Sequence, residues 1–259
     1  MILQSPTLSY KPTRIISLVP SQTELLHYLG LNDETIGITK FCVYPLEWYS
    51  TKTRVGGTKT INKKVIDQLK PDLIIANKEE NLREQIEELA KEYPVWVTDV
   101  NNLDDALQMI KDIGQLVGKI KESEDLTLQI QSNFDELERC ISKTHRAAYL
   151  IWRDPYMTVG GDTFINDMLQ RCGFINVFGD QLRYPDLTNF QFSTLNSPFI
   201  FLSSEPYPFR EKHIQELQQI VPNARIILVD GEMFSWYGSR LLYSAKYFKE
   251  LRVKLIDNS

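Results

Sequence analysis

The feature that most constrains this chain is an amphipathic segment without proline, which lies between two blocks of alternating strand-like and helix-like sequence. From Leu103 to about Ser142, apolar residues recur in steps of three and four, the spacing of one face of an α-helix. A helix of roughly 40 residues would span about 60 Å, more than the width of one small domain. The pattern therefore predicts one long helix that ties two lobes together. A coiled coil is the weaker alternative, because α/β elements flank the segment on both sides.

The block before this segment alternates buried runs with amphipathic stretches. Arg14–Pro20 is a continuous apolar run that ends in proline, as expected of a buried parallel strand. Ser21 and Glu24 have the spacing of a capping box, which predicts a helix from Ser21 that ends at Gly30. The same reading predicts strands at Thr35–Phe41, Pro71–Ala76 and Pro94–Asp99, and helices at Asn62–Leu69 and Leu82–Glu92. Such alternation is typical of a parallel sheet with helices on its faces.

The block after the segment repeats the alternation. It predicts strands at Arg146–Arg153, Pro198–Ser204 and Ala224–Asp230, and helices at Thr163–Cys172, Glu211–Ile220 and Ser239–Leu251. The predicted fold class is α/β, with two lobes of mainly parallel sheets flanked by helices and joined by one long backbone helix. The N-terminal lobe covers residues 14–102, the linking helix 103–143 and the C-terminal lobe 144–259. Because ligands of open parallel sheets bind beyond the carboxyl ends of the strands, we expect a ligand in a cleft between the lobes.

Composition narrows the classes of partner. The chain has 259 residues, a hydrophobic fraction of 42% and a formal net charge of −5. No apolar run reaches the roughly 18 residues that a membrane-spanning helix needs. The acidic balance, without a Lys/Arg patch interleaved with aromatics, argues against nucleic acid as a partner. The first twenty residues lack the pattern of a secretion signal.

The residues that usually carry catalysis or bind metal show no arrangement that supports either. His27, His145 and His213 share no metal-ligand spacing, and His213 follows a lysine on a helix that we expect to be exposed. The three cysteines lie far apart, and Cys172 is expected to be a small buried hydrophobe. Capping explains Ser21 better than nucleophilic catalysis does, and no paired carboxylates or Ser–His–Asp order appears. We therefore expect no enzyme activity, no catalytic residue and no metal site.

Aromatic and polar residues collect in the loops that follow the predicted strands. These loops are Phe41–Tyr49, Arg54–Asn62, Trp152–Asp162, Ser203–Phe209 and Asp230–Arg240. A wall of aromatic rings suits a large, flat or amphipathic ligand, although about half of the rings are expected to pack the loops instead. Gly56-Gly57 and Gly160-Gly161 do not form a nucleotide-binding motif, so we interpret them as tight turns.

Several motifs in the correct order carry a resemblance to a known family. RIISLVPSQTELLHYLGL, the YP of CVYPLEW, the VGG of RVGGTKTIN and LKPDLIIA resemble the N-terminal lobe of class III periplasmic binding proteins. That family serves ABC importers of vitamin B12, haem, ferric siderophores and metal ions. IWRDPYMTVGGDTFINDML, LSSEPYPFREKH and VDGEMFSWYGSR resemble the second lobe of its cobalamin-binding branch. The resemblance extends from Arg14 to Leu251.

The resemblance implies a rigid two-lobed binder that closes little on its ligand and catalyses nothing. Together with the aromatic loops, it assigns ligand binding to Pro20, Tyr44, Thr58, Trp152, Met157, Glu232, Phe234, Trp236, Tyr237 and Arg240. Glu79 or Glu80 in the first lobe and Glu205 in the second correspond to acids that dock on a permease. Surface charge, or a favourable place at a helix start, is the alternative for these acids.

The resemblance favours a corrinoid such as cobalamin among bulky metal chelates. This chain has Thr58 where the known cobalamin binder has a tryptophan, so haem and ferric siderophores remain alternatives. We expect a monomer that requires no cofactor and partners an ABC permease in the periplasm or cell envelope. The alternative is a cytoplasmic corrinoid-binding or salvage protein without a permease.

Overall fold

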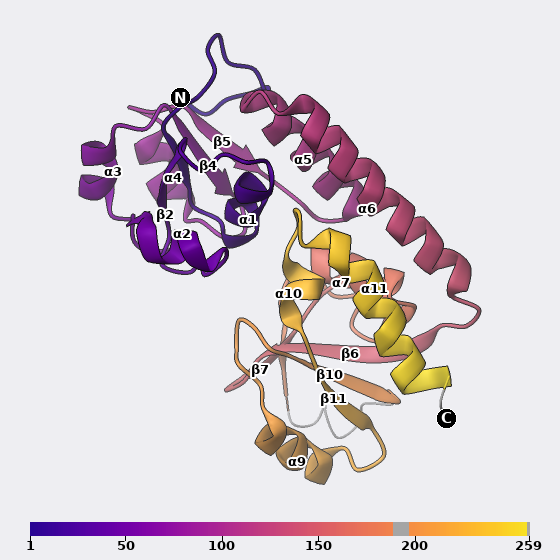
Figure 1. Cartoon of the computed structure of the whole chain (residues 1–259). Coiled ribbons are helices and arrows are strands. Elements are labelled where there is room, and N and C mark those ends of the chain that lie inside the picture. The colour runs from indigo at the N-terminus through magenta and orange to yellow at the C-terminus, as the bar shows by residue number, and fades with distance from the viewer. Residues whose placement is uncertain (189–196, 258–259) are drawn as a thin grey trace. The chain divides into compact units, whose positions relative to one another are not determined.

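The computed structural model describes residues 1–188 and 197–257, and the chain divides into two compact units (Figure 1). Unit 1 comprises Met1–Val100, Asp104–Ile130 and the short segment Trp236–Arg240. Unit 2 comprises Asn101–Leu103, Gln131–Ser235 and Leu241–Ser259. The chain therefore returns to unit 1 for five residues near its end, which the sequence did not indicate.

Unit 1 is built on a parallel sheet in the order β3-β2-β1-β4-β5. Its strands are β1 (Ile15–Ser17), β2 (Thr35–Ile38), β3 (Thr53–Arg54), β4 (Leu73–Asn77) and β5 (Val95–Thr98). β1 and β4 lie in the middle of the sheet and are wholly buried, which explains why they are apolar up to their last residues. Since the strands run in parallel, the loops that follow them gather at one edge, called here the carboxyl edge of unit 1.

Four helices lie in the same part of the chain, and one of them, at Leu46–Thr51, falls in the segment that the sequence predicted as a loop. They are α1 (Pro20–Tyr28), α2 (Leu46–Thr51), α3 (Lys63–Leu69) and α4 (Arg83–Leu89). Ile66 and Ile86 join Ile16 and Ile74 in one core cluster. The capping box predicted at Ser21 is wrong: α1 begins at Pro20, and no side chain caps its first turn. Gly30 takes a φ of +76° just after α1, as predicted for a helix end.

The predicted single helix over 103–142 is interrupted. The structure has α5 (Leu103–Leu116) and α6 (Ile120–Cys140), with Gly118 between them at a φ of +69°. A left-handed residue ends a helix, and glycine takes that conformation without a steric penalty. A Cβ on Gly114 would lie 2.0 Å from Ser123 Oγ, so the missing side chain lets α6 start close against α5. The prediction of continuity was wrong because the spacing of apolar residues does not reveal that Gly118 takes a left-handed conformation.

Unit 2 has a mixed sheet in the order β11-β10-β6-β7-β9, with β8 paired to β6. Its strands are β6 (His145–Trp152), β7 (Tyr156–Thr158), β8 (Phe174–Asn176), β9 (Asp186–Leu187), β10 (Phe199–Ser203) and β11 (Arg225–Val229). β6, β8, β10 and β11 pair in parallel, whereas β7 runs antiparallel to both β6 and β9. The antiparallel β7 follows directly from the turn after β6, which the sequence reading took only as a loop.

The helices of unit 2 are α7 (Phe164–Arg171), α9 (Glu211–Ile220), α10 (Gly231–Ser235) and α11 (Leu241–Arg252), followed by the π-helical turn η1 (Val253–Asp257). One core cluster contains Leu150, Ile200 and Leu217. A set of aromatic rings forms another part of the core, with Phe234 next to Phe248 at 4.6 Å and Tyr149 at 5.1 Å between ring centroids.

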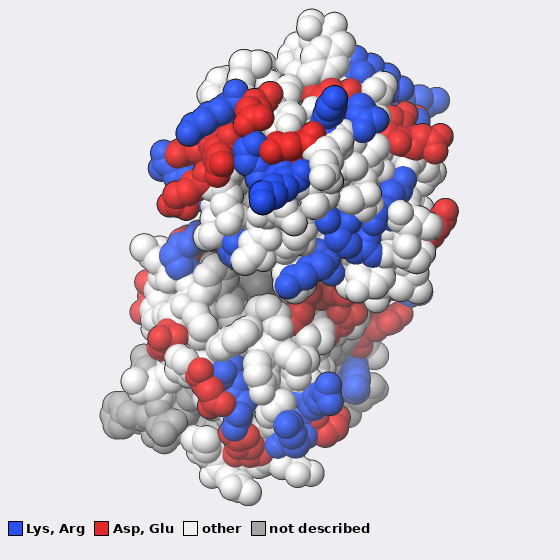
Figure 2. Space-filling model, turned by 90° about the vertical axis from the view of Figure 1, so that its left-hand side faces the viewer, with Lys and Arg blue, Asp and Glu red and all other residues white. Residues whose placement is uncertain are grey.

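Within the described ranges, no helix has both the length and the apolar character needed to cross a membrane. Positive and negative side chains interleave on the face that Figure 2 shows, as the mixed composition leads one to expect.

Candidate ligand site

Neutral polar side chains hold the carboxyl edge of unit 1 together. Asn81, just beyond β4, accepts the backbone N–H of Asn77 at 2.9 Å and donates to the carbonyls of Leu18 and Thr58 at 3.3 and 3.0 Å. Asn77 donates to the carbonyl of Thr98 at 3.1 Å. All these side chains are buried, so each hydrogen bond is made away from water. One amide thus joins the loops that follow β1, β3 and β4.

The loop that carries Thr58 is a tight turn whose shape depends on Gly56. Gly56 has a φ of +103°, and a Cβ there would lie 2.3 Å from the carbonyl oxygen of Thr60. Gly57 donates to the same oxygen at 2.9 Å. Thr58 itself is buried, and its carbonyl is held by Asn81. The glycine pair is therefore a turn, as its sequence suggested.

The segment Trp236–Arg240 brings three predicted ligand-binding residues, Trp236, Tyr237 and Arg240, into unit 1, where Tyr44 is a fourth. Arg240 lies over the rings of Tyr44 and Trp236, with its guanidinium carbon 4.8 and 4.9 Å from their centroids. The two rings approach edge to face at 6.0 Å. A Cβ on Gly238 would lie 3.0 Å from the carbonyl of Ser21, so the segment rests closely against α1. Pro20, at the first turn of α1, belongs to the same edge of the unit.

Glu24 completes this cluster, although sequence reasoning assigned it to a capping box. Arg240 donates from Nε and Nη2 to Oε2 and Oε1 of Glu24 at 3.1 and 2.7 Å. Burial raises the pKa of the Glu24 carboxyl, and the charge of Arg240 opposes that rise. No sequence signal links the two residues, because they lie far apart in the chain and the local motif that contains Glu24 predicts a different role for it.

Unit 2 places a different set of residues after β6. Trp152 is 41% exposed, and its ring meets that of Tyr207 at 5.7 Å; Met157 pairs with Trp152 across β6 and β7. Two of the predicted ligand-binding residues, Trp152 and Met157, are thus brought together. Tyr207 lies in one of the aromatic loops identified in the sequence, but it was not among the residues assigned to ligand binding.

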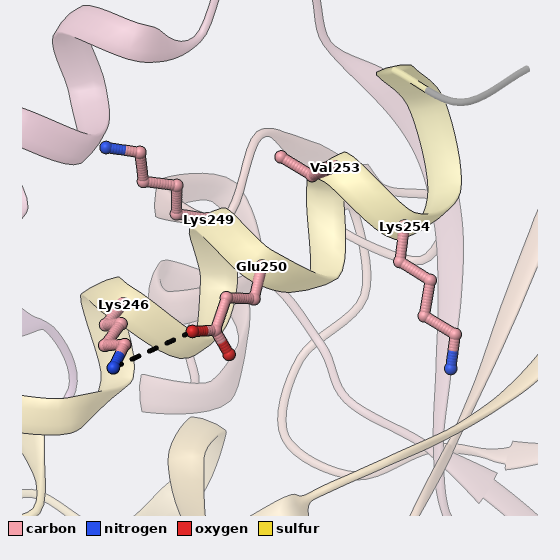
Figure 3. Close-up of a pocket in the computed structure, with 5 residues that line it drawn as sticks. All are labelled: Lys246, Lys249, Glu250, Val253 and Lys254. Carbon is pink, nitrogen blue, oxygen red and sulfur yellow. Dashed lines mark ion pairs between the residues drawn. The ribbon is translucent and has the colours of Figure 1, made fainter.

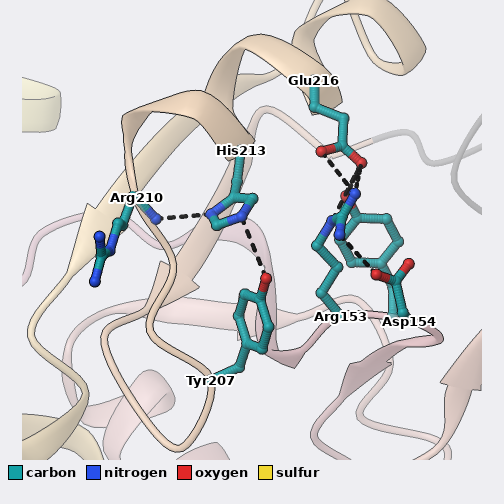
Figure 4. Close-up of polar contacts among 7 residues, drawn as sticks. Arg153, Asp154, Tyr207, Arg210, His213 and Glu216 are labelled. Atoms are coloured by element: carbon teal, nitrogen blue, oxygen red, sulfur yellow. Dashed lines mark hydrogen bonds and ion pairs between the residues drawn. The ribbon is translucent and has the colours of Figure 1, made fainter.

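Charged side chains hold the same end of β6 (Figure 4). Arg153 donates from Nη2 to Oε1 and Oε2 of Glu216 at 2.8 and 3.0 Å, and from Nη1 to Asp154 at 2.6 Å. Tyr156 donates to Glu216 at 3.1 Å. The hydrogen bonds from Arg153 lower the pKa of Glu216. The network fastens the turn after β6 to α9.

His213 lies beside this network and is buried, although the sequence predicted an exposed helix around it. Its Nδ1 accepts the backbone N–H of Arg210 at 2.8 Å, and its Nε2 lies 3.3 Å from the hydroxyl of Tyr207. The ring thus satisfies an N–H group at the start of α9 that no helical carbonyl can reach. A histidine three residues into a helix is not a usual capping residue, so the sequence did not indicate this contact.

The structure buries four of the predicted ligand residues, namely Thr58, Phe234, Trp236 and Tyr237. Phe234 is 0% exposed inside the aromatic core of unit 2, so it packs and does not line a surface. Tyr237 is also buried, within the segment that docks on unit 1. Glu232 is half-buried in the first turn of α10, where its N–H donates to Asp230.

The predicted docking acids differ in how they are held. The backbone N–H groups of Glu79 and Glu80 donate to Asn77 Oδ1 at 2.8 and 3.2 Å, which fixes the turn that carries both half-buried acids. The carboxylate of Glu205 accepts a 2.5 Å hydrogen bond from Ser235 of α10. Glu205 is therefore oriented toward a helix of its own unit.

The cysteines and acidic groups form no metal centre in the described part of the chain, where no three His, Cys, Asp or Glu side chains converge. Cys172 is buried, as predicted, and burial raises the pKa of its thiol. Cys42 is buried next to the hydroxyl of Thr23, which donates to its sulfur at 3.1 Å.

A surface pocket of about 560 Å³ lies along α11 and η1 (Figure 3). Its lining comprises Lys246, Lys249, Glu250, Val253 and Lys254. Lys246 pairs with Glu250 at 3.9 Å, and Lys249 pairs with Glu136 at 3.2 Å. None of the predicted site residues lines this pocket.

Comparisons with known proteins agree with the motifs. The family model described as periplasmic binding protein matches residues 15–218. An uncharacterised ABC transporter substrate-binding lipoprotein of Bacillus subtilis, YvrC, is 26% identical over 95% of this chain and 82% of its own length. A vitamin B12-binding protein of Pectobacterium atrosepticum is 26% identical over 91% of this chain and 86% of its own. A periplasmic haem-binding protein of Pseudomonas aeruginosa superposes with a TM-score of 0.81 at 16% identity, over 93% of this chain and 92% of its own.

Because the family model covers most of the chain, the protein belongs to the periplasmic binding protein family. The family resemblance read from the motifs and the predicted α/β class are both confirmed. The chain thus belongs to a family of binding proteins.

Proposed function

We propose that the protein is the substrate-binding component of an ABC importer, without catalytic activity and without a required cofactor. Membership of the periplasmic binding protein family supports this proposal, as does the description of the Bacillus relative as an ABC transporter substrate-binding lipoprotein. On this proposal the protein acts as a monomer in the periplasm or at the cell envelope and delivers its ligand to a permease.

The proposed ligand is a bulky metal chelate, with a corrinoid favoured. The observation that carries this proposal is the pair of rings, Tyr44 and Trp236, which contact each other and Arg240 at the carboxyl edge of unit 1. Aromatic rings offer a flat macrocycle a large contact area, and their polar tips orient it. The relative named vitamin B12-binding protein supports a corrinoid. Haem and ferric siderophores are the alternatives, because they too are large chelates.

The test is a titration of the purified protein with cobalamin, cobinamide, haemin and a ferric siderophore. Binding is followed by the visible absorption band of each ligand and by the melting temperature of the protein. A ligand present at 100 times its Kd adds about 2.7 kcal/mol to the free energy of unfolding. If neither corrinoid shifts its band or stabilises the protein, the corrinoid proposal is wrong.

A variant identifies the surface that binds the ligand. Trp236→Ala removes one of the two rings and is expected to weaken corrinoid binding by about 1–3 kcal/mol, the scale of a truncated aromatic anchor. The matched control is Tyr243→Ala on α11, where the ring is largely exposed and belongs to no predicted site. Equal affinity of both variants would remove Trp236 from the ligand surface.

We also propose that Glu79 and Glu80 dock on the permease, because Asn77 holds their turn in a fixed shape. Glu205 is the corresponding acid of unit 2, and Ser235 holds its carboxylate. The double variant Glu79→Gln/Glu80→Gln is expected to lower uptake of labelled cobalamin by cells while corrinoid affinity in solution stays unchanged. Glu87→Gln, which removes an exposed acid on α4, is the control. Unchanged uptake in the double variant would contradict the docking role.

A further inference from the structure

An exposed apolar patch lies on unit 1, in the stretch that joins β2 to β3 and contains α2 (Figure 1). We call it the exposed patch, and its members are Phe41, Val43, Leu46 and Tyr49. Leu46 is 71% exposed and Phe41 is 50% exposed. Leu46 and Tyr49 are three residues apart on α2, so they share one face of the helix. Only Trp48 of α2 is buried, so the helix is anchored by that ring and presents its other apolar side chains to water.

Basic side chains lie on the rings of the exposed patch. The ammonium of Lys40 is 5.1 Å from the ring centroid of Phe41, and the guanidinium carbon of Arg54 is 4.4 Å from that of Tyr49. Lys40 donates its backbone N–H to the carbonyl of Gly56 at 2.8 Å, two residues beyond Arg54, so the two cation–ring pairs come from adjacent stretches of chain. The positive charges are therefore held beside the exposed apolar groups.

The cations of this stretch are not neutralised by acids within the part of the chain that the structure describes. There, Lys40, Lys52 and Arg54 form no ion pair, and the last two donate to backbone carbonyls instead. Residues 40–54 contain a single acid, Glu47, so this stretch is positive on a chain whose formal net charge is −5. Unpaired cations next to exposed apolar side chains are complementary to a surface that is both anionic and apolar.

We propose that the exposed patch binds the surface of a bilayer that contains anionic phospholipids. A bilayer presents phosphate groups directly above hydrocarbon, and the patch presents cations directly beside apolar side chains. Leucine and aromatic side chains enter the boundary between headgroups and acyl chains, while lysine and arginine reach out to phosphate. A protein partner would need carboxylates fixed at the matching points, whereas mobile lipid headgroups move to meet each cation. The role goes beyond the proposed function, since it requires no ligand.

The test is flotation of the purified protein with two kinds of vesicle. One kind is phosphatidylcholine alone, and the other is an equal mixture of phosphatidylcholine and phosphatidylglycerol. The protein is expected to float with the mixed vesicles and not with the neutral ones. Binding should decrease at an ionic strength of about 1 M, where salt screens charges over about 3 Å.

A pair of double variants measures the contribution of charge. Lys40→Gln/Arg54→Gln is expected to lower binding to the mixed vesicles about 30-fold, because each cation near an anionic membrane contributes about fivefold. The matched control is Lys111→Gln/Lys121→Gln, which removes two exposed cations from α5 and α6. This control is expected to bind the mixed vesicles as the wild type does.

A second pair of variants measures the contribution of apolar insertion. Leu46→Ser is expected to lower binding to the mixed vesicles on the order of tenfold, because that side chain no longer leaves water. Leu128→Ser on α6 is the matched control, since Leu128 is 69% exposed and lies outside the exposed patch. Both leucines are largely exposed, so neither variant should change the melting temperature.

Three results would overturn the inference. The first is a wild-type protein that floats with neither kind of vesicle, which would leave the exposed patch to a protein partner. The second is equal binding to neutral and mixed vesicles, and the third is wild-type binding by both Lys40→Gln/Arg54→Gln and Leu46→Ser. The titration with corrinoids is independent of the vesicles, so the proposed function stands or fails separately.

Discussion

The loops that follow the central strands of the two units are held by different chemistry. In unit 1, the amide of Asn81 joins the loops after β1, β3 and β4 through neutral, buried hydrogen bonds. In unit 2, the ion pair of Arg153 with Glu216 fastens the turn after β6 to α9, and both side chains remain in partial contact with water. The loops of unit 1 are therefore held by hydrogen bonds between neutral groups, and the turn of unit 2 is held by an ion pair.

The difference shows how each unit should respond to its surroundings. A neutral network keeps its strength when salt or pH changes, because no member needs to be ionised. A partly exposed ion pair weakens as salt screens it, and the neighbouring His213 adds a histidine whose pKa burial lowers. Unit 1 should therefore keep its loops in one arrangement over a wider range of conditions than unit 2.

The largest expected effect comes from breaking the neutral network. Asn81→Ala removes the acceptor of the Asn77 N–H and the donor to two buried carbonyls. Each buried group left without a partner costs on the order of 1–3 kcal/mol, so we expect a loss of about 3 kcal/mol in the free energy of unfolding. Urea denaturation at low and high salt measures it, and the loss should not depend on salt.

Asn133→Ala is the matched control, since its amide donates to the carbonyl of Leu242 at an exposed position. It is expected to cost less than about 1 kcal/mol, because water replaces the lost hydrogen bond. An equally small loss in Asn81→Ala would show that the network of unit 1 is not what holds its loops.

Sequence patterns predicted the elements of this fold well wherever one local rule determines the structure. The buried strands β1, β4 and β10 and the helix α9 follow from apolar runs and helical spacing alone. The break at Gly118 was missed because the cost of a glycine in a helix is small, whereas its left-handed conformation is decided by how α6 packs on α5.

The candidate site was predictable only as a set of loops. Tyr44, Trp236 and Arg240 were assigned from aromatic content and from the family resemblance, and the structure brings them together. Glu24 could not be found, because a capping box accounted for it locally and its true partner lies far along the chain. Phe234 has the same composition signal as Trp236, and both are buried, but Phe234 packs on Phe248 in unit 2 whereas Trp236 contacts Arg240 in unit 1. Only the fold distinguishes the two.

The free energy of unfolding should also depend on pH, through two histidines. Burial lowers the pKa of His213 and of His145, with Lys212 and Arg153 adding to the effect on His213 and Glu216 opposing it. Because the unfolded chain binds these protons more tightly, stability is complete above the ordinary histidine pKa of 6.5 and falls as pH drops below it. The slope cannot exceed about 1.4 kcal/mol per pH unit for each histidine, the value for one proton taken up on unfolding.

The check is the urea midpoint of the wild-type protein and of His213→Gln between about pH 7.5 and pH 5, where histidine changes its charge. In the wild type, protonation at Nδ1 breaks the hydrogen bond from Arg210. The variant should start from a lower stability and lose less of it on acidification. Parallel curves for the two proteins would mean that His213 is not protonated on unfolding in this range.

The smallest expected effect comes from breaking the charged network of unit 2. Arg153→Gln leaves Glu216 with only the hydroxyl of Tyr156 among the partners described above and releases Asp154. Since these groups are partly exposed, we expect a loss of about 1 kcal/mol at low salt, which decreases when the ionic strength reaches about 1 M. The lost bidentate contact should also free the turn between β6 and β7, so amide hydrogen exchange of Asp154 and Tyr156 should accelerate. If the loss of stability does not change with salt, the charge of the ion pair does not hold the turn of unit 2. The contrast between the two units would then be wrong.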